Sequence, residues 1–294
     1  MLKNPNFEEG FYRAGADELV LGNGWVPWWD ERDPTDVPDG SSGGYNRRPE
    51  YRPEDSQVYG TRRVRKGRYS QKFFTLYGTH TAGFYQQVQV PKNWKVKFGI
   101  WVQVWSSQKD DPNVSEQPGE YRVCVGIDPY GGTDPLSDQV VWGEVLEQYD
   151  KWIQPVVETE SLAETITVFT KAFPRWRVKH NDSYWDEASL ELVEHVMHYR
   201  SHYVLFPQGV ERTWYEAALP YLLHYRVTNG QSADDAGVVH GDLGHTITVI
   251  NPDEELLNYL RRKFTADLDI ITAATPAELG TILNQRVESN ARFG

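Results

Sequence analysis

Residues 84–105 read FYQQVQVPKNWKVKFGIWVQVW, and this stretch decides the fold. From Val96 to Trp105, apolar residues alternate strictly with aromatic and polar ones. Because successive side chains of a strand point to opposite faces, this half predicts a strand with one apolar face and one aromatic-polar face. The residues at 91–93, Pro-Lys-Asn, are typical of a turn. We therefore expect two neighbouring antiparallel strands on either side of them.

The aromatic-polar face of this stretch is the main candidate for a binding site. Trp and Tyr rings can stack on the weakly apolar face of a sugar, and neighbouring amides can hydrogen-bond its hydroxyls. The alternative is that another part of the chain, such as residues 30–55 or the C-terminal domain, covers this face. The predicted carbohydrate-binding residues are Tyr85, Gln87, Trp101, Gln103, Trp105 and Trp28.

Composition excludes several classes of protein. The chain has 42 acidic and 30 basic residues in a total of 294, which gives a formal net charge of −12. Nucleic-acid binding needs a positive field, so we expect no nucleic-acid partner. No apolar run reaches the length of about 18 residues that a membrane span needs, so we expect no membrane insertion. The single cysteine, Cys124, excludes an internal disulfide.

Two domains are predicted, with the boundary after Val193. Residues 1–193 contain many short strand patterns separated by Gly, Pro and Asp turns, which predicts an all-β sandwich. Residues 194–294 contain three apolar strand patterns, each followed by a helix pattern. Strands joined through helices pair in parallel, so we expect a small α/β domain of βαβαβα order with a three-stranded parallel sheet. The predicted strands are 202–206, 246–250 and 268–272.

The three expected helices begin with similar sequences. In each case a Thr or Asn is followed three residues later by Glu, at Thr213, Asn251 and Thr275. This is the pattern of a capping box, in which the first residue caps the helix and the glutamate bonds back. We therefore expect each of these residues to be an N-cap.

Two polar segments of the first domain are interpreted as surface. Residues 30–55 are rich in Pro, Gly, Ser, Arg and Asp, which is typical of a long loop rather than a regular element. Residues 62–68 are strongly basic. The favoured interpretation of this run is an exposed strand edge, or a partner of nearby acidic surface, and an anion-binding site is the alternative.

The ends of the first domain carry a family resemblance. The opening NPNFEEGF (Asn4 to Phe11), the segment GWVPWW (Gly24 to Trp29) and the closing WDEASL (Trp185 to Leu190) resemble carbohydrate-binding modules of the family 4, 9 and 22 type. The resemblance covers residues 4–192. It implies a galactose-binding-like jelly roll whose glycan site lies on the concave face of a sheet.

The same resemblance implies a structural calcium ion that joins the first and last strands. Its ligands would be Glu8 and Asp186, and calcium prefers several such oxygen ligands. The alternative is that both residues are ordinary surface carboxylates near a seam. Residues 200–294 faintly resemble the cell-wall-binding repeats of bacterial surface proteins, through YVLFPQ (Tyr203 to Gln208) and the TITVIN strand.

These features predict a non-catalytic protein that binds a polysaccharide or another glycan. No P-loop, G-x-G-x-x-G or H-E-x-x-H motif occurs, although a pair of glycosidase carboxylates is left open. The expected location is extracellular, on a cell surface or on a virion surface, and the N-terminus lacks the apolar core of a signal peptide. The alternative is a structural subunit of a virion or filament, whose sandwich makes protein–protein contacts in a homo-oligomer or larger assembly.

Overall fold

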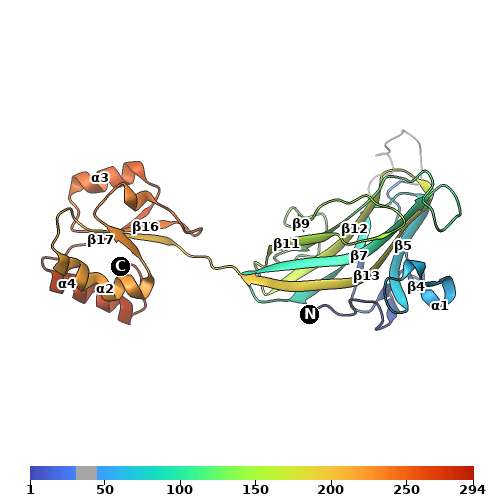
Figure 1. Cartoon of the computed structure of the whole chain (residues 1–294), viewed down its shortest axis with the longest axis horizontal. Helices are drawn as coiled ribbons and strands as arrows, with labels where there is room; N and C mark the ends of the chain where they lie inside the picture. The colour runs from blue at the N-terminus through green and yellow to red at the C-terminus, as the bar shows by residue number, and fades with distance from the viewer. Residues whose placement is uncertain (31–44) are drawn as a thin grey trace. The chain divides into compact units, whose positions relative to one another are not determined.

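The apolar side of the 94–105 stretch forms the centre of a buried core. Val96, Phe98, Ile100, Val102 and Val104 are completely buried, as their alternation predicts. They lie on β7 (Trp94–Ser107), one of the long strands in Figure 1. The computed structural model describes residues 1–30 and 45–294.

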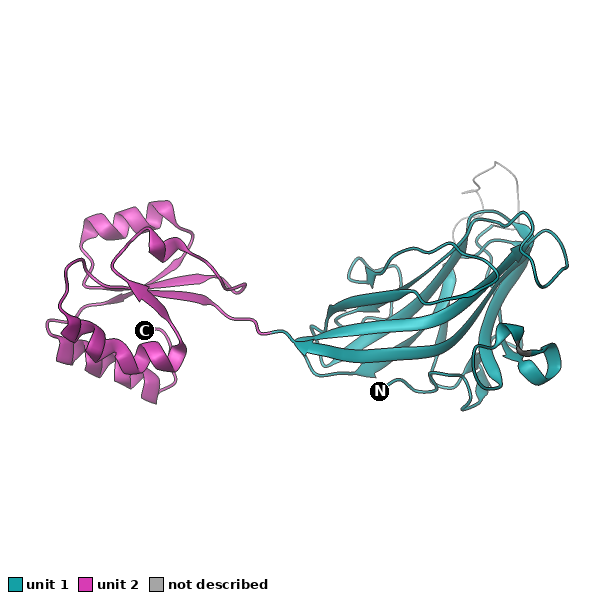
Figure 2. Ribbon diagram, in the orientation of Figure 1, with its two compact units in different colours: residues 1–196 teal, residues 197–294 magenta. Residues whose placement is uncertain are grey.

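The described chain divides into two units, Met1–Val196 and Met197–Gly294 (Figure 2). The division falls after Val196, whereas the sequence placed it after Val193. Unit 1 consists of two antiparallel sheets that pack face to face, so the prediction of an all-β sandwich is confirmed.

We call the two sheets of unit 1 the front sheet and the back sheet. A small hairpin and a short helical segment accompany them. The front sheet has the order β4 (Glu50–Asp55), β5 (Tyr69–Gly78), β13 (Val178–His195), β7, with β10 (Trp152–Ile153) and β11 (Val156–Glu160) both paired to the far edge of β7. The back sheet has the order β3 (Val26–Trp29), β6 (Ala82–Gln89), β12 (Thr165–Pro174), β8 (Tyr121–Asp128), β9 (Val141–Trp142). The hairpin is β1 (Phe11–Arg13) and β2 (Val20–Gly22), and the helical segment is α1 (Ser56–Tyr59) with the 3-10 turn η1 (Thr61–Arg63).

Aromatic rings fill the space between the two sheets. Phe73 and Trp185 stack with their ring centroids 6.0 Å apart, and Phe84 meets Trp185 edge-on at 5.9 Å and Trp25 edge-on at 5.1 Å. Offset and edge-on contacts of this kind add to the free energy gained from burying apolar area. Much of the unusual aromatic content of the sequence therefore serves the core.

The predicted pairing of the two halves of the 84–105 stretch is wrong. β6 belongs to the back sheet, where it pairs with β3 and β12, and β7 belongs to the front sheet. The turn between them is hydrogen-bonded to residues before β12, because Val90 N–H donates to the Glu164 carbonyl and Asn93 N–H donates to the Ser161 carbonyl. The same turn residues can form a hairpin or a connection between two sheets. Here they form the connection, because the core lies between the sheets, with β6 on one side and β7 on the other.

The interpretation of both polar segments also changes. Residues 50–55 form the edge strand β4, where Pro53 is tolerated because an edge strand leaves one row of N–H groups unpaired. Residues 31–44 of the expected loop lie outside the described residues. The basic run does not form a strand edge, since Arg62 and Arg63 lie in η1 and residues 64–68 lead into β5.

Unit 2 is a parallel sheet with helices on both faces. Figure 1 shows α2 and α4 on one face and α3 on the other, and separate apolar clusters fill the two interfaces. The sheet order is β15 (Thr228–Gly230), β14 (Ser201–Leu205), β16 (His245–Ile250), β17 (Asp267–Ile271). The helices are α2 (Arg212–Tyr225), α3 (Glu254–Lys263) and α4 (Pro276–Glu288), with the 3-10 turn η2 (Asp235–Gly237).

The three predicted parallel strands are confirmed, but the predicted number is wrong. The fourth strand, β15, pairs in parallel with β14. It consists of only Thr-Asn-Gly, which has neither the length nor the apolar content that marks a strand in a sequence. No helix among the described residues is long and apolar enough to cross a membrane.

Only one of the three predicted helix caps is correct. Thr275 caps α4, accepting from Glu278 N–H at 3.2 Å. The cap of α3 is Asp253, because Asn251 instead pairs its amide with the backbone of Ala273. Helix α2 begins at Arg212, one residue before the predicted cap at 213.

Candidate functional site

Three of the predicted binding residues lie on the outer face of the front sheet. Trp101, Gln103 and Trp105 alternate along β7 with the buried valines. Their partners on β13 are Asp186, Tyr184 and Asp182, which therefore share this face with them.

The other three predicted residues lie on the back sheet. Tyr85 and Gln87 project from the outer face of β6, and Trp28 projects from β3. Because β6 and β7 belong to different sheets, the six residues do not form one surface. Their participation in one binding site therefore has no geometric basis.

On the back sheet the rings are packed rather than open. Trp28 is only 5% exposed and donates its indole N–H to the Thr170 carbonyl at 3.1 Å. Tyr85 packs on Phe169 with ring centroids 5.5 Å apart. Gln87 is exposed, and its amide donates to the Gly131 carbonyl at 2.8 Å.

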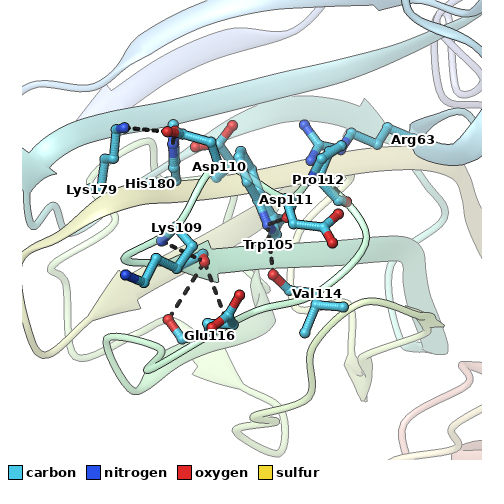
Figure 3. Close-up of polar contacts among 12 residues, drawn as sticks. Arg63, Trp105, Lys109, Asp110, Asp111, Pro112, Val114, Glu116, Lys179 and His180 are labelled. Carbon is cyan, nitrogen blue, oxygen red and sulfur yellow. Dashed lines mark hydrogen bonds and ion pairs between the residues drawn. The ribbon is translucent and has the colours of Figure 1, made fainter.

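Trp105 is also covered, with 7% of its area exposed. Its ring stacks on His180 at 4.3 Å, and its indole N–H donates to the carbonyls of Asp111 at 3.1 Å and Val114 at 3.3 Å. Figure 3 shows the loop that follows β7 passing over the ring, with Arg63 close by. The expectation of an open indole at this position is therefore wrong, because the chain folds back over it.

Hydrogen bonds hold this covering loop, residues 108–116, in place. Asp110 accepts from Lys179 at 2.6 Å and from His180 at 2.8 Å, and these bonds lower the pKa of its carboxyl group. Gln108 N–H donates to the Glu116 carbonyl at 2.9 Å, which closes the base of the loop. The loop is thus attached to β13 as well as to its own ends.

Two guanidinium groups of the basic segment cover the remaining aromatic surface. The Arg63 guanidinium lies 4.3 Å from the Trp105 ring centroid and 4.6 Å from that of Tyr184. The Arg65 guanidinium lies 3.3 Å from the ring centroid of the half-buried Trp101. Such cation–π contacts are attractive and leave the N–H groups at the edge of a guanidinium able to donate. Those of Arg63 donate to the Tyr184 hydroxyl and to the Pro112 carbonyl at 3.3 Å.

A cleft of about 1280 Å³ opens beside this covered region, and we call it the front cleft. Its floor is formed by β4 and β5, and its walls include the α1–η1 segment and the covering loop at residues 112–113. The lining side chains used below are Arg52, Glu54, Tyr59, Arg62, Arg63, Lys72 and Phe74.

Lys72 of the front cleft connects to a group of buried polar side chains on β13. Lys72 contacts the buried carboxylate of Asp182 at 2.8 Å, and Tyr184 donates its hydroxyl to the same oxygen at 2.9 Å. Burial raises the pKa of Glu54, while Lys72 and Arg63 act in the opposite direction. Among the described residues, the second oxygen of Asp182 has no hydrogen-bond partner, and the same is true of Gln103 Oε1.

Two aromatic side chains of the front cleft were not among the binding residues predicted from the sequence. Tyr59 is 69% exposed at the rim, and Phe74 is partly exposed on the floor. Tyr59 ends a four-residue helix, which is too short to leave a periodic signal. The basic run did mark one wall, because Arg62 and Arg63 belong to it.

The predicted calcium ligands do not fit a calcium ion. Glu8 Oε1 accepts from the N–H groups of Arg68 at 2.7 Å and Tyr69 at 2.8 Å. Asp186 Oδ2 accepts from the N–H groups of Arg65 at 3.0 Å and Lys66 at 3.1 Å. Amide hydrogens thus point at one oxygen of each carboxylate, where a cation would otherwise bind. The described residues also contain no group of three or more His, Cys, Asp or Glu residues that could hold a metal.

Glu8 and Asp186 instead hold the basic segment against the sandwich. The pKa of the Asp186 carboxyl group is raised to about 7, mainly by burial, with backbone hydrogen bonds acting against the rise. Its other oxygen accepts from Glu187 N–H at 2.8 Å. Three backbone donors therefore depend on this one carboxyl group.

We expect a chelator to leave the melting temperature of the protein unchanged. Asp186→Ala should lower the free energy of unfolding by about 1–3 kcal/mol, because it removes the acceptor of three part-buried backbone hydrogen bonds. Thermal unfolding of both proteins, with and without chelator, measures both effects. If chelator destabilises the native protein but not Asp186→Ala, the calcium prediction is right.

No protein-family model and no curated protein matches this chain. Solved structures that resemble it include the carbohydrate-binding module TmCBM61 in complex with β-1,4-galactotriose, with 14% identity, a TM-score of 0.41 and coverage of 65% of this chain and 97% of that one. Another is the CBM22-1 xylan-binding domain of Xyn10C from Paenibacillus barcinonensis, with 13% identity, a TM-score of 0.36 and coverage of 65% and 93%.

A third is the enzymatically active domain of tailspike protein 4 from bacteriophage CBA120. It is 7% identical, with a TM-score of 0.37, and the match covers 58% of this chain but only 20% of the tailspike chain. The first two are carbohydrate-binding modules, and the second belongs to family 22, one of the families that the sequence resemblance named. Likenesses at this level do not identify a ligand.

Proposed function

We propose that this protein binds a glycan in the front cleft without altering it chemically. The observation that carries the proposal is the pairing of an exposed aromatic ring, Tyr59, with a sheet-borne set of hydrogen-bonding side chains in one cleft. A sugar ring presents a weakly apolar face that can stack on an aromatic ring, and its hydroxyls need donors and acceptors beside it.

The floor of the front cleft supplies these polar groups at fixed positions. Arg52 and Lys72 lie opposite each other on β4 and β5, so backbone pairing sets their spacing. Side chains held by a sheet lose little freedom when a ligand binds, which favours affinity. The unpartnered acceptors of Asp182 and Gln103 are buried and do not line the cleft, so they suit an ordered water rather than the ligand.

Binding rather than hydrolysis is proposed because the carboxyl groups are poorly arranged for turnover. Glycoside hydrolysis needs two carboxyl groups that flank the scissile bond. Among the described residues, Glu54 is the only carboxylic acid that lines the front cleft. Asp182 is buried and already engaged by Lys72 and Tyr184. A glycan ligand also agrees with the expected location outside the cell, or on a cell or virion surface.

Removing the exposed ring should test the proposal. We expect Tyr59→Ala to weaken retention by a soluble polysaccharide in affinity electrophoresis about tenfold, because stacking of one ring is worth on the order of 1–2 kcal/mol. The matched control is Tyr130→Ala, which removes another exposed tyrosine outside the cleft and should leave retention unchanged.

The panel for this experiment should contain xylan, β-1,4-galactan, polygalacturonate and chondroitin sulfate. The proposal is overturned if none of these or a wider glycan array retains the native protein, or if both variants lose retention equally. A structural subunit of a virion or filament would instead show large assemblies of the purified chain in light scattering, with no glycan retention.

A further inference from the structure

We propose that the glycan bound in the front cleft is anionic and carries carboxylate or sulfate groups. This inference rests on the proposed function, since it names the class of ligand for the same site. Two observations lead to it. They are the sign of the charges that line the cleft and the guanidinium groups that cover the neighbouring aromatic rings.

The charge of the front cleft is opposite to that of the whole chain. The chain has a formal net charge of −12. Among the described residues, the cleft is nevertheless lined by a single acidic residue, Glu54, and by five cationic residues, which are Arg13, Arg52, Arg62, Arg63 and Lys72. A concave site lined by one sign of charge attracts ligands of the other sign.

Internal salt bridges account for only part of this positive charge. Arg13 pairs with Asp17, Arg52 with Glu50 and Lys72 with Asp182. Within residues 1–30 and 45–294, neither Arg62 nor Arg63 forms a salt bridge with a carboxylate. The charge of Arg62 contributes to the lowered pKa of Asp111, but it contributes less than the hydrogen bonds from Asn113. Arg63 donates its terminal N–H groups to the Tyr184 hydroxyl and to the Pro112 carbonyl at 3.3 Å. The exposed guanidinium of Arg62 is thus the group left for an external anion.

The second observation concerns the aromatic surface that a neutral sugar would use. Arg63 lies over Trp105 and Tyr184, and Arg65 lies over Trp101. A neutral sugar stacks on bare rings, and these ring faces are already occupied. A guanidinium stacked on a ring is held in one orientation, and its planar N–H groups match a carboxylate or sulfate through paired hydrogen bonds.

Affinity electrophoresis with polygalacturonate, chondroitin sulfate, β-1,4-galactan and xylan tests the inference. We expect retention by one or both acidic polymers at least tenfold stronger than by the neutral ones. Polygalacturonate carries only carboxylates, and chondroitin sulfate also carries sulfates, so their comparison distinguishes the two anions. Poly-L-glutamate, which has carboxylates but no sugar rings, should compete only weakly.

Variants of the cleft provide the decisive comparison. Arg62→Gln should weaken retention by the acidic polymer roughly tenfold, whereas Arg175→Gln, an exposed arginine outside the cleft, should not. Glu54→Gln removes the only carboxyl group that lines the cleft within residues 1–30 and 45–294. It should strengthen retention several-fold, a gain that loss of structure cannot produce. Each variant is checked by thermal unfolding.

The possible failures of the two proposals can be told apart. Strong retention by a neutral polymer, lost in Tyr59→Ala but kept in Arg62→Gln, would overturn the anionic ligand and leave glycan binding intact. Equal competition by poly-L-glutamate would overturn both, because it would show attraction of any polyanion. A failure of every polymer to bind would likewise overturn both.

Discussion

Replacing Trp105 with alanine should lower the free energy of unfolding of unit 1 by about 3–4 kcal/mol, the usual cost of truncating a buried tryptophan. The ring is 7% exposed and lies between His180 and the Arg63 guanidinium. Its indole N–H also donates hydrogen bonds to two carbonyls of the covering loop, which hold the loop in place. Urea unfolding followed by tryptophan fluorescence measures the change, since Trp214 is the only tryptophan outside unit 1.

The matched control is Trp152→Ala, because Trp152 is half-buried on the two-residue edge strand β10. It should cost clearly less than Trp105→Ala. An unchanged midpoint for Trp105→Ala would mean that the indole is open to solvent, as the alternation along β7 alone suggests. In that case the covering loop would not be closed over it.

Replacing Arg286 with methionine should destabilise unit 2 by about 3–5 kcal/mol, because it leaves a buried carboxylate without its cation. Both terminal nitrogens of the guanidinium contact Asp269, at 2.6 and 3.0 Å, and both side chains are nearly buried. Thr248 donates a further hydrogen bond to the same carboxylate at 2.7 Å. Loss of the helical signal in far-UV circular dichroism reports the unfolding, since α2, α3 and α4 all lie in unit 2.

The double variant Arg286→Met, Asp269→Leu is the control, and it should recover much of the lost stability because no charge remains buried. Acid provides a second check. Burial acts to raise the pKa of Asp269, but hydrogen bonds from Arg286 and Thr248 outweigh it and hold the pKa below its usual value. The stabilisation is therefore present above about pH 4 and is lost as pH falls through the folded-state pKa. A single variant no less stable than the native protein would contradict the role of this pair.

The sequence alone determined the elements and their inward faces. Strict alternation from Val96 to Val104 identified a strand and the side that is buried, because the period of two is a property of the extended backbone itself. The strand–helix order of residues 197–294 likewise indicated a parallel α/β sheet, since chain direction limits how such strands can pair. β15 and β4 are exceptions. β15 has only three residues, which carry too little information, and residues 50–55 have the polar composition of a loop.

Which strands lie side by side was decided only by tertiary structure. Pro91 and Asn93 suit several turns, and the need to bury both sheets against each other placed β6 and β7 in different layers. That decision separated Tyr85 and Trp28 from Trp101 and Trp105. A local pattern contains no information on the partner strand, so it could not predict this separation.

Whether a ring on the outer face is open or covered was also decided by contacts between distant residues. Trp105 is covered by Arg63, His180 and the covering loop, whereas Tyr59 remains exposed. Alternation tells which side of a strand a residue occupies, but solvent exposure depends on what else packs on that side. For this reason the sequence identified the β7 face and its basic neighbours, while the cleft beside them, with its positive lining, appeared only once β4, β5 and the α1–η1 segment were placed in space.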